Sequence, residues 1–343
     1  MSAQLPFSED ELPAYLAGLG LLSPGEPALV ERAGDGNINW VRRVRSSARE
    51  RSFVVKQARP ALERFPEYRV STHRIEVEAL WYATVARFDR DRVCPHVHHF
   101  DAQRMALVLE DLGGAEPLDA WLARGADASH TAAVLGVFLG AVHAGTRDPA
   151  LAIQFDNEEM RHLHGEHIFV LPFRANDFPL APAVRRRADA LASERELVRR
   201  IDAAYARYLE SALALVHADV QPSNVLVAAS GPKLLDGEIA HLGDPAFDVG
   251  QLAGHLWLSA LARGEPRAAA PAVRSLWSAY SEALGGALAV GFADALVYAG
   301  IEMLRRTLGA ARVAEVSRDE IALRVIDAGR AWVLAPPAHP SLL

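Results

Sequence analysis

The stretch that decides the fold is "LVHADVQPSNVLV", Leu215 to Val227, in which a polar turn separates two apolar segments. Asp219 and Asn224 lie five positions apart in this turn. Asp236 follows Asn224 by twelve residues, directly after the apolar pair "LL". Any one of these three residues could be a turn residue that bonds its own backbone. Together, at this spacing and beside short apolar strands, they indicate a site instead.

The spacing is typical of phosphoryl transfer by enzymes of the protein-kinase type, which use a loop aspartate, an asparagine five residues later and a metal-binding aspartate after the next hairpin. The reaction needs oxygen ligands for Mg²⁺ and a group that accepts the proton of the attacking hydroxyl. We therefore predict that Asp219 positions and deprotonates the acceptor hydroxyl. Asn224 and Asp236 are predicted to hold the metal, with Glu238 as a further ligand. His217 is predicted to support the loop by bonding backbone.

A second group of candidates lies in the first third of the chain. Lys56, in the apolar strand "SFVVKQA", is predicted to contact the α- and β-phosphates of ATP, oriented by a glutamate of the next helix. Glu76 is the first candidate for that glutamate and Glu78 the second. An exposed strand lysine is the alternative interpretation of Lys56.

Two backbone segments complete the predicted nucleotide site. The turn made by Gly34, Asp35, Gly36 and Asn37 can offer N–H groups to phosphate, although Asp-Gly is also an ordinary hairpin turn. The strand end near Glu110 and Leu112 is predicted to bond the purine through its backbone, an inference from position alone.

The order of predicted elements indicates an α+β, bilobal architecture. Residues 1–113 are predicted to form a small β-rich lobe that binds nucleotide, with strands over 38–46, 51–58, 97–101 and 104–112 and a helix over 71–88. Glycines 113 and 114 form a hinge. Residues 114–343 are predicted to form a larger helical lobe, with long helices over 185–216 and an embedded hairpin that carries the catalytic loop, the metal site and the acceptor site. We expect the ligand in a cleft between the lobes.

Composition excludes several other classes of function. The chain has 343 residues, a formal net charge of −7 and one cysteine, Cys94. This balance argues against a general binder of nucleic acid or membrane surfaces, and one cysteine fits a reducing cytoplasm. The beginning of the sequence predicts no signal peptide, and the longest apolar run, residues 131–146, is shorter than a bilayer span. We expect a cytoplasmic protein whose partner is a small hydroxylated molecule; the sequence leaves its oligomeric state open, with a homodimer as one option.

These residues bring the chain close to a known superfamily. "VHADVQPSN" resembles the His-Gly-Asp-Leu-His…Asn loop of the kinase-like phosphotransferases of small molecules, which include aminoglycoside phosphotransferases and methylthioribose kinases. "LLDGEIAHLGDPAFDVGQL" resembles their metal-binding segment and the Gly-Asp-Pro…Asp-Leu/Ile-Gly stretch that follows it. The resemblance implies a protein-kinase-like fold with ATP and Mg²⁺ as cofactors.

Three further stretches are similar to methylthioribose kinases in particular. They are "GDGNINWVRRV" with "FVVKQARP", "NEEMRHLHGEHIFVLPF" (157–173) and "AGIEMLRRTLGAARV" (299–313). This similarity implies that Arg305 and Arg306 reach the site and bind substrate or stabilise phosphoryl charge. Adjacent helical residues point about 100° apart, so both can reach one spot only if a side chain bends.

The loop itself departs from the methylthioribose kinase pattern. Ala218 stands where the family has glycine, Gln221 replaces the second loop histidine, Asn224 replaces a serine-like residue, and Gly237 replaces the proline of Asp-Pro-Glu. The resemblance implies a methylthioribose-like 5-substituted ribose as the acceptor. An aminoglycoside- or choline-type phosphotransferase is the alternative enzyme, and a catalytically inactive nucleotide-binding module is the alternative from another class.

Overall fold

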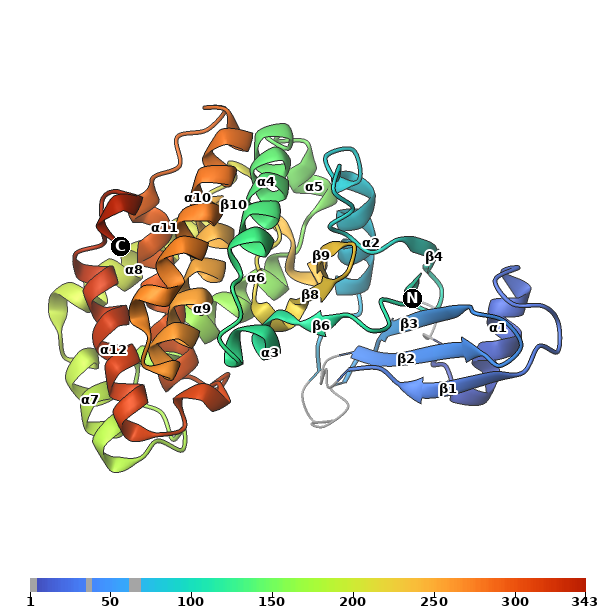
Figure 1. Cartoon of the computed structure of the whole chain (residues 1–343), viewed down its shortest axis with the longest axis horizontal. Coiled ribbons are helices and arrows are strands. Elements are labelled where there is room, and N and C mark those ends of the chain that lie inside the picture. Colours follow the sequence, from blue (N-terminus) through green and yellow to red (C-terminus); the bar gives the residue numbers. More distant parts are fainter. Residues whose placement is uncertain (1–4, 35–38, 62–68) are drawn as a thin grey trace. The chain divides into compact units, whose positions relative to one another are not determined.

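A computed structural model describes residues 5–34, 39–61 and 69–343 of the chain. The chain divides into two compact units. The first consists of Met1–Thr84 and Cys94–Gly114, and the second of Val85–Val93 and Ala115–Leu343. The first unit is built on an antiparallel sheet and the second is mainly helical, so the predicted α+β class is confirmed (Figure 1). The sequence did not suggest that residues 85–93 pack with the second unit.

The first unit is a five-stranded antiparallel sheet in the order β1-β2-β3-β5-β4. Its strands are β1 (Ala28–Arg32), β2 (Asn39–Ser46), β3 (Ser52–Ala58), β4 (Val97–Asp101) and β5 (Ala106–Glu110), and it contains α1 (Leu12–Gly18) and nearly all of α2 (Arg74–Val85). Four strands and α2 lie where the sequence predicted them, whereas β1 and α1 were not predicted. Leu12 and Leu16 of α1 share a buried cluster with Trp40 and Val44 of β2.

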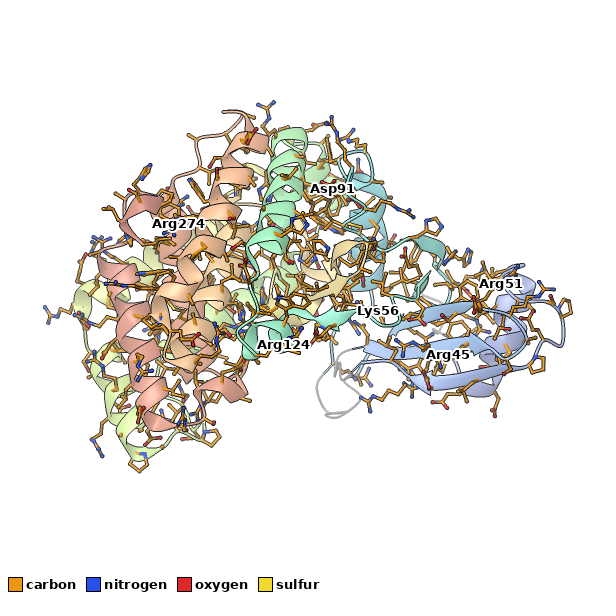
Figure 2. All side chains as sticks on the ribbon, viewed as in Figure 1. Arg45, Arg51, Lys56, Asp91, Arg124 and Arg274 are labelled. Atoms are coloured by element: carbon orange, nitrogen blue, oxygen red, sulfur yellow. The ribbon has the colours of Figure 1, made fainter. Side chains whose placement is uncertain are left out.

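Strand β3 holds Lys56 in a fixed register at the centre of this sheet. Lys56 lies opposite Val41 of β2 and Leu107 of β5. Its neighbour Gln57 is fully buried, and the Gln57 amide accepts a hydrogen bond from the Phe7 N–H at 3.0 Å. In Figure 2, Lys56 lies at one end of the β2–β3 hairpin strands and Arg51 at the other. Pairing on both edges gives Lys56 a rigid backbone.

The second unit consists mostly of helices. Its helices are α3 (Leu118–Ala123), α4 (Ser129–Gly145), α5 (Leu151–Gln154), α6 (Glu158–Gly165), α7 (Pro182–Ala192), α8 (Arg195–Glu210), α9 (Ala246–Arg263), α10 (Ala270–Leu284), α11 (Phe292–Leu308) and α12 (Asp319–Leu334). Helix α6 continues into a π-helical turn, Glu166–Val170. Within the described ranges, no helix is both long enough and apolar enough to cross a lipid bilayer.

Two small sheets are embedded among these helices. They are formed by β6 (Glu116–Pro117), β8 (Val225–Ala228) and β9 (Gly231–Leu234), and by β7 (Ala214–Val216) with β10 (His241–Gly243). The prediction of helix as far as residue 216 was therefore wrong. Residues 214–216 pair with the distant residues 241–243, and this tertiary pairing overrides local helix preference.

Two glycines allow α4 and α10 to pack at very close range. A Cβ atom on Gly136 would lie 2.4 Å from the backbone oxygen of Leu276, and one on Gly140 would lie 2.6 Å from that of Tyr280. Real Cβ atoms do not approach backbone oxygens so closely, so the two helices would have to separate to admit a methyl group. Figure 1 shows α4 and α10 running side by side.

We expect Gly136→Ala to destabilise the protein by about 1–3 kcal/mol, because the added methyl group overpacks the α4–α10 contact. Urea unfolding monitored by circular dichroism measures this loss. Gly18→Ala is the matched control, since a Cβ there meets nothing within 4 Å and alanine is the better helix former. Equal midpoints for the two variants would contradict the packing described above.

Candidate active site

The backbone of the predicted catalytic loop, His217 to Asn224, is anchored by one buried carboxylate. Asp248, at the start of α9, is fully buried. Its Oδ2 accepts a hydrogen bond from the His217 N–H at 2.8 Å, and its Oδ1 accepts one from the Ala218 N–H at 2.8 Å. His143 Nε2 lies 3.2 Å from Oδ2. Burial by itself would raise the pKa of Asp248, but the bond with His143 and the nearby His217 bring that pKa below its usual value.

This anchoring holds Ala218 in an unfavourable backbone conformation. The φ angle of Ala218 is 65°, in the left-handed region that costs a residue with a Cβ about 1–2 kcal/mol. Glycine adopts such a conformation freely, which explains why the family pattern has glycine there. The predicted structural role of His217 is confirmed: its Nε2 lies 3.0 Å from the Leu235 carbonyl and its Nδ1 accepts from the Asp219 N–H.

The two oxygens of the Asp219 carboxylate have different surroundings. Oδ2 accepts short hydrogen bonds from Gln221 Nε2 at 2.8 Å and from Asn224 Nδ2 at 2.7 Å. Oδ1 has longer contacts, with Gln251 Nε2 at 3.4 Å and His164 Nε2 at 3.9 Å. The side chain is 14% exposed. Oδ2 is therefore held by two short hydrogen bonds, while Oδ1 is the less strongly bonded acceptor.

The predicted metal ligands lie on backbone segments that are bonded to each other. The Asn224 amide nitrogen donates to Asp219, so its carbonyl Oδ1 is the atom that a cation would use. The Leu235 N–H donates to the Asn224 carbonyl at 2.8 Å, which fixes Asp236 next to Asn224 in the chain fold. Asp236 has a left-handed φ of 65°, and Glu238 is buried. Amide and carboxylate oxygens are the donors that Mg²⁺ prefers.

No group of three or more His, Cys, Asp or Glu side chains suited to a metal occurs among the residues that the structure describes. The predicted set contains only two carboxylates, Asp236 and Glu238, with the Asn224 amide as its third member. The metal role of the three residues stays a prediction.

Arg305 and Arg306 converge on one carboxylate of their own helix. Glu302 precedes them by three and four positions on α11, and such residues share a helix face. Arg305 Nη1 lies 3.1 Å from both Glu302 oxygens, and Arg306 Nε lies 2.6 Å from Oε1. Both arginines are buried. Adjacent positions on a helix point about 100° apart. The two arginines still meet at one carboxylate because each side chain bends back along the helix toward Glu302.

Glu302 makes this burial of two positive charges tolerable. Burial raises the pKa of Glu302, but Arg305 and Arg306 outweigh it and hold that pKa well below its usual value. His255 Nε2 lies 3.1 Å from Glu302 Oε1, and burial lowers the pKa of His255. Arg306 Nη2 also donates to Gln221 Oε1 at 2.6 Å. The arginine pair is thereby connected to the predicted catalytic loop.

His164 joins the same cluster from the end of α6. Its Nε2 lies 3.5 Å from Arg305 Nη2, and burial, together with Arg305, lowers its pKa well below the usual value. Within the described part of the chain, His164 Nδ1, Gln251 Oε1 and Arg305 Nε are buried without a hydrogen-bond partner.

Sequence reasoning missed several of these residues as members of the site. They are His143, His164, Asp248, Gln251, His255 and Glu302. Two of them had a signal in the sequence: Asp248 lies in the "GDPAFDVG" stretch, and Glu302 stands three and four positions before the arginine pair. His164 and Gln251 also lie in stretches quoted for their resemblance, but nothing in those stretches singled them out, and His143 and His255 carry no local pattern.

The first unit contains a buried ion pair at Lys56. Lys56 Nζ lies 2.6 Å from Glu78 Oε2, and the Tyr82 hydroxyl donates to Glu78 Oε1 at 3.0 Å. Glu76, the first candidate, was therefore wrong as the partner of Lys56: it is exposed and lies 3.0 Å from His73 Nδ1. Two positions on a helix are about 200° apart, so only one of the two glutamates can face the sheet. The alternative of an exposed Lys56 is excluded, since it is buried.

The other predicted nucleotide contacts are described only in part. Gly34 has a φ of 73°, the left-handed conformation expected in a tight turn, while Asp35, Gly36 and Asn37 lie outside the described residues. Strand β5 ends at Glu110. The Glu110 N–H already donates to the His96 carbonyl at 2.9 Å, and Leu112 follows beyond the end of the strand.

We expect Glu302→Gln to destabilise the protein by about 3–5 kcal/mol, because it leaves two buried arginines without their counter-charge. Glu159→Gln, at an exposed position of α6, should change stability by less than about 0.5 kcal/mol. The depressed pKa of Glu302 means that its contribution is fully present above the unfolded-state pKa of about 4.3 and is lost as the pH falls through the folded-state value. Urea midpoints between pH 7 and pH 3 should therefore show the wild type and Glu302→Gln converging in acid; a constant difference would contradict the ion-pair explanation.

Comparison with known proteins places this geometry in a family. Residues 30–287 match the family described as "Phosphotransferase enzyme family". The methylthioribose kinase of Pectobacterium atrosepticum is 29% identical, over 98% of this chain and 96% of that protein, and the one of Bacillus velezensis is 28% identical, over 92% and 86%. A choline/ethanolamine kinase family protein from Mesorhizobium loti has a similar fold, with a TM-score of 0.51, 20% identity, and coverage of 95% of this chain and 98% of that one. Since the family match extends over well more than half of its length, the chain belongs to the phosphotransferase enzyme family.

Proposed function

We propose that the protein is an ATP-dependent kinase that transfers the γ-phosphoryl group to a hydroxyl of a methylthioribose-like 5-substituted ribose. The observation that carries the proposal is the Asp219 carboxylate, with Oδ2 held by two amide donors and Oδ1 less committed. A carboxylate in this state can accept the proton of an attacking hydroxyl. The buried Arg305 and Arg306 behind it suit the charge of a phosphoryl group in transfer.

The reaction assigns one task to each group. The acceptor oxygen attacks the γ-phosphorus as the bond to the ADP oxygen breaks, and Asp219 Oδ1 takes the hydroxyl proton. Lys56, oriented by Glu78, contacts the α- and β-phosphates. Asn224, Asp236 and Glu238 would hold Mg²⁺, which would neutralise charge on the phosphates.

Backbone groups complete the binding of ATP in this proposal. The phosphates are assigned to backbone N–H groups of Gly34, Asp35, Gly36 and Asn37, as the sequence predicts. The segment that includes Glu110 and Leu112 bonds the purine. Pairing of Lys56 with Glu78 is the arrangement that active protein kinases require of these two residue types, and it supports the assignment of Lys56.

A neutral sugar is the acceptor that the relatives support. Arg305, Arg306 and Glu302 together carry one excess positive charge, which the Asp219 carboxylate offsets, and the pKa values of His164 and His255 are lowered. The arginine pair therefore balances the carboxylates of the loop and supplies donors for a phosphoryl group. The methylthioribose kinases at 28–29% identity support a sugar as the acceptor.

A pocket beside the loop supports an acceptor that has both polar and apolar parts. It has a volume of about 280 Å³ and includes Gln221, Ser223 and Arg306 in its lining. Leu258 and Val313 contribute apolar surface, which suits an alkylthio substituent. The same lining also includes Asp119 and Glu315.

Those two carboxylates favour the second candidate function, a choline- or aminoglycoside-type phosphotransferase, because a cationic acceptor seeks negative charge. An inactive nucleotide-binding module is the least favoured alternative. Such a module has no need of Lys56, Asp219, Asn224 and Asp236 all together.

We expect release of ADP from ATP and Mg²⁺ with methylthioribose, and little with choline or an aminoglycoside such as kanamycin. A coupled ADP assay measures the rates, and mass spectrometry of the product confirms a single added phosphate. Faster turnover of choline or kanamycin would show that Asp119 and Glu315 outweigh the arginine pair. Tight ATP binding by calorimetry with no phosphorylated product from a broad panel of acceptors would show an inactive module.

A further inference from the structure

Gln221 connects a buried arginine to the proposed catalytic carboxylate. Its Oε1 accepts a hydrogen bond from Arg306 Nη2 at 2.6 Å, and its Nε2 donates to Asp219 Oδ2 at 2.8 Å. A guanidinium can only donate and an ionised carboxylate can only accept. The two neighbours therefore allow a single orientation of the Gln221 amide, and they hold it from both sides.

The arginine end of this connection is fixed in the core of the second unit. Arg306 Nε donates to Glu302 Oε1 at 2.6 Å, and Glu302 is itself in contact with His255 and Arg305. All four side chains are buried. Glu302 of α11 therefore contacts both His255 of α9 and Arg306. Arg306 in turn bonds Gln221 of the loop, and Gln221 bonds Asp219.

These contacts restrict the rotation of the Asp219 carboxylate. A carboxylate that rotates about its Cβ–Cγ bond presents either oxygen equally well. Here Gln221 and Asn224 both bond Oδ2, while the contacts of Oδ1 with described residues are longer, 3.4 Å with Gln251 and 3.9 Å with His164. Two donors on one oxygen fix the plane of the group.

We infer that Gln221 is a positioning residue, which holds the Asp219 carboxylate so that Oδ1 receives the proton of the acceptor hydroxyl. The inference rests on the proposed function and deepens it. Gln221 acts only through Asp219 and does not touch the reacting atoms. Its loss leaves Oδ2 with one donor, Asn224, and lets the carboxylate turn.

Substitutions at position 221 separate this role from simple packing. Gln221→Leu removes both hydrogen bonds at similar size. Gln221→Glu keeps an acceptor for Arg306 but places a second carboxylate against Asp219. Gln221→His restores both bonds in principle, because a neutral imidazole has one donor and one acceptor. Gln154→Leu, at an exposed position of α5, is the matched control.

Steady-state kinetics with the acceptor identified by product analysis provide the test. We expect kcat of Gln221→Leu and Gln221→Glu to fall by roughly 10- to 100-fold, the loss typical of a displaced catalytic group. KM for ATP should stay within about threefold, because Gln221 is not among the proposed ATP contacts. Gln221 does line the pocket proposed for the acceptor, so kcat is measured at saturating acceptor. Gln221→His should recover most of kcat, and Gln154→Leu should match the wild type. Unfolding midpoints of all variants show whether a loss of activity is a loss of fold.

Three results would overturn the inference: an unchanged kcat in Gln221→Leu, a loss confined to KM, or no recovery in a folded Gln221→His. A crystal structure of Gln221→Leu gives a readout that does not depend on turnover. We expect the Asp219 carboxylate plane to rotate away from Asn224; an unmoved carboxylate would refute positioning by Gln221. If the wild type phosphorylates no acceptor, the proposed function fails, while the crystal structure still decides the positioning role.

Discussion

The hydrogen bonds from two loop amides to Asp248 are the constraint on which the rest of the site depends. The His217 and Ala218 N–H groups both bond this fully buried carboxylate, and Ala218 takes a left-handed conformation between its neighbours. That conformation directs the chain toward Asp219 instead of continuing strand β7. Without the anchor, an alanine would relax to an ordinary backbone conformation and Asp219 would no longer meet Gln221, Asn224 and Gln251.

A second layer of the site is electrostatic. Two arginines are buried on one helix because Glu302 stands one turn earlier and bonds both. Buried charges are tolerated only when they are paired and hydrogen-bonded, and the helix spacing provides both conditions at once. The result is a rigid, net positive group next to a carboxylate, an arrangement suited to a reaction in which negative charge is redistributed.

Local sequence patterns predicted many residues of this site, whereas the remaining residues are brought there by tertiary contacts. The loop and strand β3 were predictable because Asp219, Asn224 and Lys56 stand in short apolar segments with polar residues at defined spacings. The choice between Glu76 and Glu78 was not predictable, since it depends on the rotation of α2 about its axis. Strand β7 was missed because its partner, β10, lies more than twenty residues away. His164 and Gln251 contact Asp219 from α6 and α9. Both lie in stretches with a recognisable pattern, but the contact depends on how these helices pack, which the pattern does not give.

In the proposed reaction, the Asp219 carboxylate receives the acceptor proton. The rate of a single turnover of bound ATP by Asp219→Asn, compared with the wild type at saturating acceptor, tests it most directly, because asparagine has nearly the same shape but is a far weaker base. We expect the rate to fall by about 10²- to 10⁴-fold, with the affinity for ATP unchanged by calorimetry. A rate equal to that of the wild type would contradict the claim.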